Sequence, residues 1–492
     1  MTVARGSGST MNENPPKRMT SRGTALLIVL WAAVLAVLAC SGCHAPVVVA
    51  KPQLFAEGEL FLYLEPFPRD ANRLDFTVAG VSAIKNDGTE IPLTLRLTEA
   101  TPATMKWQRM LGSAILPGGR YSGLSFRIAG AGIKTDEGRM ALLPPEKPVM
   151  IEFPFVVEPQ KAVLVSLTLD EEASVNKRFS FSPVFKAEIP GRPLWGLTGF
   201  VTNKGANTIA VFDKREARVT EFIETGRAPA GIVFDQAARR AYVALSGDDA
   251  VEVIDLMADY SLTRIRLSIG DAPAELALTP DGRTLLVSNS GSNTLSFVDP
   301  ASQSELARVI VGSRPGAVIV DRLGRTAYVL NTLSNSVSVV DIARRAVVAT
   351  LPTETSPLWA QLNRRGDRLL VIHELSPYLV DIDLTTRSTA KRVYVGMGAR
   401  TIKIDTSTDQ IYIAKRGDSV IDVFDPFSLL PGNFITGGGS PSYLTIDGEH
   451  NNLLALLSGS KRLQFIGLVG KREVAQIDVG DEPYRVVVAG ER

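Results

Sequence analysis

The side chains that most often carry out chemistry are scarce in this chain of 492 residues, which has two cysteines and three histidines. Both cysteines and one histidine lie in the segment Cys40-Ser41-Gly42-Cys43-His44. The spacing C-x-x-C-H is that of a c-type haem attachment site. We do not favour haem here, because the motif directly follows a hydrophobic run and no obvious haem pocket comes after it. We therefore expect no cofactor. With no other cysteine, the body of the chain has no disulfide and no thiolate metal site.

The hydrophobic run before the motif is typical of an export signal. Residues 24–39 read TALLIVLWAAVLAVLA, a length of 16 residues that is short for a bilayer span and suits a signal peptide. The long region before it suggests Met19 as an alternative start. The basic residues that precede the run are Arg5, Lys17, Arg18 and Arg22.

The end of this run, Val37-Leu38-Ala39-Cys40, resembles a bacterial lipobox. The resemblance implies a signal peptide over 1–39, acylation of Cys40 and a tether over 40–56 that holds the protein to a membrane. Cys43 is the alternative lipidation site. Ser at position 41 resembles the sorting signal that directs enterobacterial lipoproteins to the outer membrane. The sequence does not distinguish the periplasmic face of that membrane from its surface face.

Residues 57–190 contain about seven segments of strand length separated by turn residues. They alternate or run apolar, as in ELFLYLEPF, YSGLSFRIAG and VMIEFPFVV. This pattern predicts a β-sandwich. The order of the segments resembles a domain of unknown function that bacterial lipoproteins carry behind the lipid anchor. Residues 191–196 form the hinge to the next domain.

The remainder, 191–492, is a repeat. One column places a proline at the start of a strand, and another places an aspartate at the end of a strand; neighbouring members of each column are 42 or 44 residues apart. The proline column is Pro229, Pro273, Pro315, Pro357, Ala399, Pro441 and Pro483; the aspartate column is Asp213, Asp255, Asp299, Asp341, Asp383, Asp425 and Gly467. A period of this length with short strands predicts propeller blades.

Each unit holds four short apolar runs rich in valine, isoleucine and leucine, which predicts four strands per blade. The first unit begins at its second strand, and the chain ends on a first strand, Tyr484 to Ala489. We therefore expect an all-β protein, a β-sandwich followed by a seven-bladed β-propeller, in which the last strand completes the first blade. Segments such as YVLNTLSNSVSVVD resemble the bacterial YVTN-type propeller repeats.

Composition and motifs exclude several functions. A net charge of +1 and a pI near 7.7 give no reason to expect nucleic acid as a partner. The sequence lacks a nucleophile elbow, a P-loop, an H-E-x-x-H motif and an EF-hand loop. Asp381 and Asp383 share one strand face, but without a third carboxylate we predict no metal site.

Positions that depart from the repeat at one mouth of the propeller are the candidate ligand-binding residues. They lie at the start of a first strand or the end of a second, and large or cationic side chains gather in the later blades. We expect Arg400 and Lys415 to be accessible to solvent. The candidates are Trp359, His373, Glu374, Arg400, Lys415, Tyr443, Tyr484 and Arg485. A basic, aromatic rim suits a small anionic ligand, a carbohydrate or a protein.

Structural roles compete with these interpretations. A single histidine such as His373 is commonly a hydrogen-bonded structural residue, Lys415 is commonly solvated, and Trp359 can fill the channel. The aspartate column is structural, each carboxylate bonding the next turn. We predict a binding or scaffolding module of the cell envelope. The alternative is a lactonase-like hydrolase acting at the mouth, for which His373 with Glu374 would be the starting point.

The first prediction concerns the anchor. Cys40→Ala should abolish labelling by a fatty-acid analogue, because it removes the thiol that is acylated, whereas Cys43→Ala should still be labelled. Loss of label only in the Cys43 variant would reverse the assignment. A haem absorbance band in the denatured protein would contradict lipidation altogether.

Overall fold

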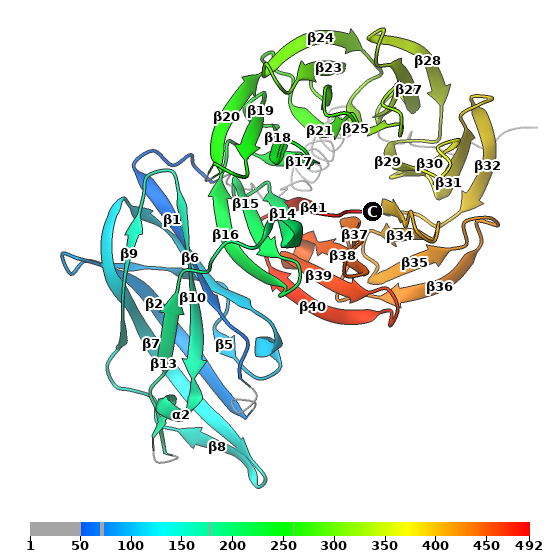
Figure 1. Cartoon of the computed structure of the whole chain (residues 1–492). Coiled ribbons are helices and arrows are strands. Elements are labelled where there is room, and N and C mark those ends of the chain that lie inside the picture. Colours follow the sequence, from blue (N-terminus) through cyan, green and yellow to red (C-terminus); the bar gives the residue numbers. More distant parts are fainter. Residues whose placement is uncertain (1–50, 69–72, 177–178, 259) are drawn as a thin grey trace, which may run out of the picture. The chain divides into compact units, whose positions relative to one another are not determined.

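The computed structural model describes residues 51–68, 73–176, 179–258 and 260–492. The predicted export signal, both cysteines and the C-x-x-C-H motif lie outside these residues. The described part is almost entirely β-structure (Figure 1). Among these residues no helix has the length and apolar character needed to cross a membrane.

Two mixed or antiparallel sheets make up the N-terminal region. The first contains, in spatial order, β13 (Val184–Glu188), β10 (Ala162–Asp170), β1 (Glu57–Leu64), β6 (Arg109–Pro117) and β4 (Thr94–Leu95). The second contains β3 (Glu90–Pro92), β2 (Leu74–Lys85), β7 (Gly119–Thr135) and β8 (Gly138–Leu142), with β5 (Glu99–Ala100) on β2 and β9 (Val149–Val157) on β7. The helix α2 (Glu171–Ser174) precedes a small hairpin of β11 (Val175–Asn176) and β12 (Ser180–Phe181).

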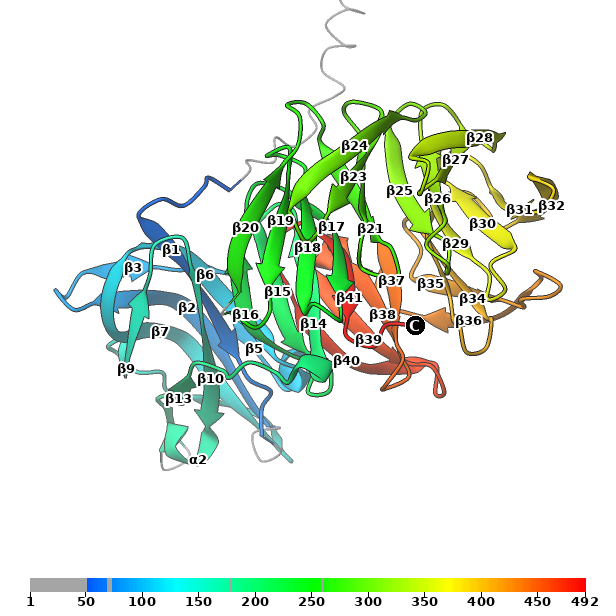
Figure 2. The same cartoon turned by 45° about the horizontal axis from the view of Figure 1, so that its top comes forward.

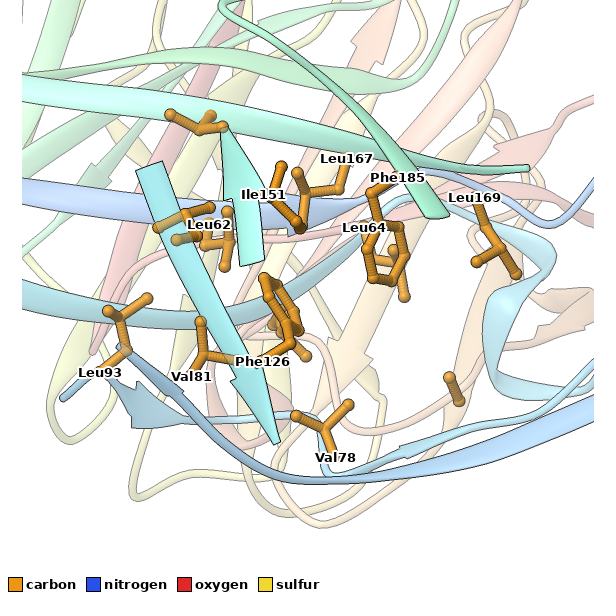
Figure 3. Packing of buried hydrophobic residues seen from close by; sticks show 14 of the residues in the cluster. Leu62, Leu64, Val78, Val81, Leu93, Phe126, Ile151, Leu167, Leu169 and Phe185 are labelled. Atoms are coloured by element: carbon orange, nitrogen blue, oxygen red, sulfur yellow. The ribbon is translucent and has the colours of Figure 1, made fainter. Parts of the chain in front are cut away.

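Both N-terminal sheets bury residues in one hydrophobic cluster. Leu62 and Leu64 of β1 lie in it together with Val81 of β2 and Phe126 of β7 (Figure 3). Along β2, buried positions alternate with more exposed ones over much of the strand. Since successive side chains of a strand point to opposite faces, this alternation gives the sheet one apolar face.

Seven four-stranded antiparallel sheets follow, each resembling a propeller blade. From the axis outward the first three are β41 (Pro483–Val488), β14 (Thr198–Asn203), β15 (Thr208–Asp213), β16 (Arg218–Glu224); β17 (Pro229–Asp235), β18 (Arg240–Leu245), β19 (Ala250–Asp255), β20 (Ser261–Arg266); and β21 (Pro273–Leu278), β22 (Leu285–Asn289), β23 (Thr294–Asp299), β24 (Ser304–Ile310). The fourth and fifth are β25 (Pro315–Val320), β26 (Thr326–Asn331), β27 (Ser336–Asp341), β28 (Ala346–Pro352); and β29 (Pro357–Leu362), β30 (Arg368–His373), β31 (Tyr378–Asp383), β32 (Ser388–Tyr394). The last two are β33 (Ala399–Ile404), β34 (Ile411–Lys415), β35 (Val420–Phe424), β36 (Pro431–Thr436); and β37 (Tyr443–Asp447), β38 (Asn452–Leu457), β39 (Arg462–Gly467), β40 (Arg472–Asp478).

The aspartate column has the structural role that the sequence predicts. The Oδ1 atom of Asp213 accepts hydrogen bonds from the backbone N–H groups of Arg215 and Glu216, at 2.8 and 2.9 Å. Asp383 does the same for the two residues at corresponding positions of its own turn. These bonds satisfy the turn between the third and fourth strands, which is why the repeat keeps an aspartate there.

The asparagines at the end of the second strands do more than permit a turn. Asn289 and Asn331 are fully buried, and the Nδ2 of each donates to hydroxyl groups on the third strand of its own blade. Asn331, for example, lies 3.2 Å from the Oγ of Ser336. The buried amide thus holds the second and third strands together by hydrogen bonds. This role explains why asparagine recurs at the end of the second strand.

The C-terminal strand completes the first blade, as the sequence predicts. β41 pairs antiparallel with β14, with Val487 opposite Phe200 (Figures 1 and 2). The turn after β15 secures this seam: the buried Nζ of Lys214 donates to the carbonyl of Ala489 at 2.7 Å and to Asp447 of the last blade at 2.8 Å. One lysine therefore joins the two ends of the array.

The N-terminal sheets and the blades belong to one compact unit, Lys51–Arg492. Asp478, at the end of β40, accepts from the Nε of Arg109 at 2.8 Å and from the backbone N–H of Met110 at 3.0 Å. The rings of Phe61 and Phe222 stack with centroids 3.8 Å apart. A buried charge pair and an aromatic contact therefore join the first sheet to the first and last blades.

The second prediction concerns ring closure. Deleting residues 483–492 should abolish the cooperative unfolding transition, because it removes β41 and exposes the backbone edge of β14 to other chains. Circular dichroism during heating measures the transition, and light scattering measures aggregation. The control is Glu482→Ala, which changes an exposed side chain just before the strand. An unchanged melting curve for the deleted protein would show that the seam does not hold the ring.

Candidate functional site

A cavity of about 130 Å³ lies where the innermost strands begin. Five of the predicted candidates line it, and they come from four separate sheets. These residues are Trp359, Arg400, Tyr443, Tyr484 and Arg485. The remaining lining residues are Glu275, Gly316, Ala317, Thr332, Leu358, Thr401, Ser442, Ser458 and Pro483. The register of the repeat thus brings together five candidates that are up to 126 residues apart in the chain.

The guanidinium of Arg485 occupies the centre of this wall. Its Cζ lies 4.1 Å from the ring centroid of Trp359 and 4.3 Å from that of Tyr443. The two rings are nearly perpendicular, at 88°, with centroids 6.0 Å apart. Contacts of this kind between a cation and two aromatic faces are attractive, and more so where water is excluded.

Arg485 also pairs with a residue that the sequence argument passed over. Its Nη1 lies 3.6 Å from an Oε1 of Glu275, whose side chain is almost fully buried. Burial raises the pKa of Glu275, and the positive charge of Arg485 opposes that rise. Glu275 stands in the same repeat column as Trp359, and its two neighbours in that column are Gly231 and Ala317, so the criterion that selected Trp359 also selects Glu275.

Two donors in the cavity wall have no hydrogen-bond partner among the described residues. They are the indole Nε1 of Trp359 and the Nε of Arg485, both inaccessible to solvent. A buried donor without an acceptor costs on the order of 1–3 kcal/mol. Neither atom is exposed to the cavity, so a bound molecule would have to shift these side chains before it could supply acceptors to them.

Arg400 is the guanidinium of the wall that is least engaged. Its Nη1 is 3.9 Å from Glu374, which is beyond hydrogen-bond distance, and its side chain is 35% exposed. Glu374 bonds closely to Arg416 instead, at 2.7 Å. The expectation of an accessible Arg400 agrees with this geometry. Glu374 itself does not line the cavity.

Two other candidates point elsewhere. His373 is fully buried, with Nε2 2.7 Å from the Oγ1 of Thr353 and Nδ1 3.0 Å from the carbonyl of Tyr378. Lys415 turns to Asp422 in its own blade, with Nζ 2.8 Å from the carboxylate. We expected Lys415 to be accessible to solvent; its side chain is 21% exposed, and it is engaged by Asp422 on the next strand of the hairpin.

Two sets of carboxylates outside the cavity that could be considered for metal binding are paired with basic side chains. Asp447, Glu449 and His450 lie close enough to share a metal ion, but the Nζ of Lys214 is 2.8 Å from Asp447 and 3.0 Å from Glu449. An ammonium group in that position opposes a second cation. Asp381 likewise faces Arg368, at 3.6 Å.

Comparisons with known proteins agree with the architecture. A family model described as a YNCE-like beta-propeller matches residues 212–409. A functionally unknown protein from Desulfotomaculum acetoxidans is similar in structure, with a TM-score of 0.51 at 12% identity, over 59% of this chain and 98% of that one. A putative 6-phosphogluconolactonase from Bacteroides uniformis has a TM-score of 0.49 at 14% identity, over 59% and 98%. At 12% identity the likeness to the first of these proteins shows the fold alone. No curated protein sequence matches the chain.

The third prediction concerns His373. His373→Leu should lower the free energy of unfolding by about 1–3 kcal/mol at neutral pH, because Thr353 and the carbonyl of Tyr378 lose their partner. Burial lowers the pKa of His373 in the folded protein. The unfolded chain therefore binds the proton first, and wild-type stability present above about pH 6.5 is lost as the pH falls toward the lowered pKa.

The leucine variant lacks this proton linkage, so the difference in stability between the two proteins should shrink on acidification. Denaturant titrations at several pH values measure it. A difference that stays constant or grows at low pH would contradict a neutral, structural His373.

Proposed function

We propose that this protein is a ligand-binding module of the cell envelope, and that its ligand occupies the cavity lined by Trp359, Arg400, Tyr443, Tyr484 and Arg485. The observation that carries the proposal is this cavity, where two arginines and three aromatic residues from four sheets meet. The corresponding positions of earlier blades hold small residues such as Gly231 and Ala317. The large and charged side chains of the later blades therefore support a role beyond folding.

The proposal includes a place in the cell. The lipobox-like sequence before Cys40 supports a lipid anchor, with the outer membrane as its destination. The N-terminal sheets form a β-sandwich next to that anchor, and the seven blades form a closed propeller that presents the cavity. Membrane lipid is then the partner of the N-terminus, and a small molecule is the partner of the propeller.

A hydrolase at the same mouth has less support. Its proposed starting point, His373 with Glu374, does not line the cavity, and both ring nitrogens of the histidine have partners. Glu275 is the one carboxylate among the lining residues, and it pairs with Arg485. General base catalysis needs a group free to accept a proton from the substrate. Binding therefore accounts better for this set of side chains.

The fourth prediction tests occupation of the cavity. Gly316 lines it, and a Cβ built there meets only the Oγ1 of Thr332, at 3.5 Å, without a left-handed backbone. Gly316→Leu should therefore fill the cavity and leave the blade folded. Gly130→Leu is the matched control, because Gly130 in β7 also has open space around it.

The measurement is the melting temperature with acetate, pyruvate, inorganic phosphate, acetamide or glucose added in turn. A compound that binds only the folded state raises the melting temperature with concentration. We expect at least one to do so for the wild type and for Gly130→Leu, and to have no effect on Gly316→Leu. Equal shifts in all three proteins would place the ligand outside the cavity.

A further inference from the structure

The aromatic side chains of the cavity offer little free surface for stacking. Arg485 lies over the rings of both Trp359 and Tyr443. The Nζ of Lys204 is 5.6 Å from the ring centroid of Tyr484. A carbohydrate that stacks on aromatic faces would have to displace these cations. The structure therefore favours recognition through the cations themselves.

The charges that line the cavity leave one positive charge in excess. Arg400 and Arg485 are positive and Glu275 is negative, and no other lining residue is an arginine, lysine, aspartate or glutamate. Glu275 already compensates Arg485. Arg400 makes no hydrogen bond to another described side chain in the structure, and its nearest carboxylate, on Glu374, stays at 3.9 Å. A ligand with a single negative charge would compensate it.

The size of the cavity limits what can enter. At about 130 Å³ it is smaller than the roughly 300–1,000 Å³ of pockets that hold drug-sized ligands. The guanidinium group of arginine is a planar fork whose two N–H groups match the two oxygens of a carboxylate. A phosphate group carries about 1.5 to 2 negative charges near neutral pH, which exceeds the one positive charge in excess.

We propose that the cavity binds a small carboxylate anion of a few carbon atoms, with its two oxygens held by Arg400 and its body against the side chains around Arg485. This inference rests on the proposed function, since it names the class of ligand for the same cavity. Arg400, which makes no hydrogen bond to a described side chain and has its nearest carboxylate at 3.9 Å, is the specificity determinant. The pair of Arg485 and Glu275 holds the aromatic rings in position behind it.

The fifth prediction tests this class with matched ligands. Titration calorimetry should compare carboxylates of two to five carbons with the corresponding carboxamides, which have the same shape and no charge, and with inorganic phosphate. We expect at least one carboxylate to bind about tenfold or more tightly than its carboxamide and than phosphate. The preference should weaken as salt is added, because charge recognition at a partly exposed site is screened.

Two variants assign the preference to Arg400. Arg400→Gln should weaken carboxylate binding about tenfold or more and leave carboxamide binding unchanged, as expected for loss of a charge-assisted bond. Arg416→Gln is the control, since Arg416 contacts the same Glu374 but does not line the cavity. Circular dichroism should show both variants folded.

The outcomes separate the two proposals. If neutral ligands bind in wild type and fail to bind in Gly316→Leu, while carboxylates show no preference, the cavity is a binding site and the carboxylate assignment is wrong. Tighter binding of phosphate would also overturn the assignment. If Arg400→Gln binds carboxylates as wild type does, the anion lies elsewhere. If no compound is sensitive to Gly316→Leu, the proposed function fails with it.

Discussion

The pairing of β41 with β14 is the constraint on which the rest of the array depends. Each blade buries its faces only against its two neighbours, so every sheet is stable as part of a closed set. The first blade receives its inner strand from the opposite end of the chain. Closing this sheet costs the loop entropy of nearly three hundred residues, but that cost grows only slowly with loop length. The burial of Val486 and Val488, together with the contacts of Lys214, compensates it.

Repetition makes the fold easy to read from the sequence. Proline begins the inner strand of most units, and aspartate ends the third strand of most. The aspartate accepts the N–H groups of the next turn, which requires only its own neighbours along the chain. Features that depend on a few adjacent residues were therefore predicted, including the four strands of each blade. The offset of the repeat at its two ends also predicted the strand that completes the first blade.

The site was predicted less completely, because its contacts join different blades. The repeat register placed Trp359, Arg400 and Arg485 at one mouth, since the register fixes where each strand begins. It did not show which way a side chain turns at the end of a second strand. Lys415 forms an ion pair with Asp422 on the next strand of its own hairpin, and the buried side chain of His373 lies within hydrogen-bond distance of Thr353. Asp422 lies on the neighbouring strand and Thr353 directly after β28 of the preceding blade, and the column of second-strand ends contains neither of them.

Arg485 connects ring closure with the candidate site. It lies on β41, the strand that closes the ring, and its guanidinium contacts Trp359 of the fifth blade, Tyr443 of the seventh and Glu275 of the third. The cation therefore meets these partners only when the ring is closed. A ligand that binds the assembled wall binds the folded state alone, so its binding free energy adds to the stability of the closed ring. In the same way, a change that weakens the pairing of β41 with β14 also separates Arg485 from its partners in the cavity wall. Ligand binding at the mouth and the stability of the ring are therefore thermodynamically linked.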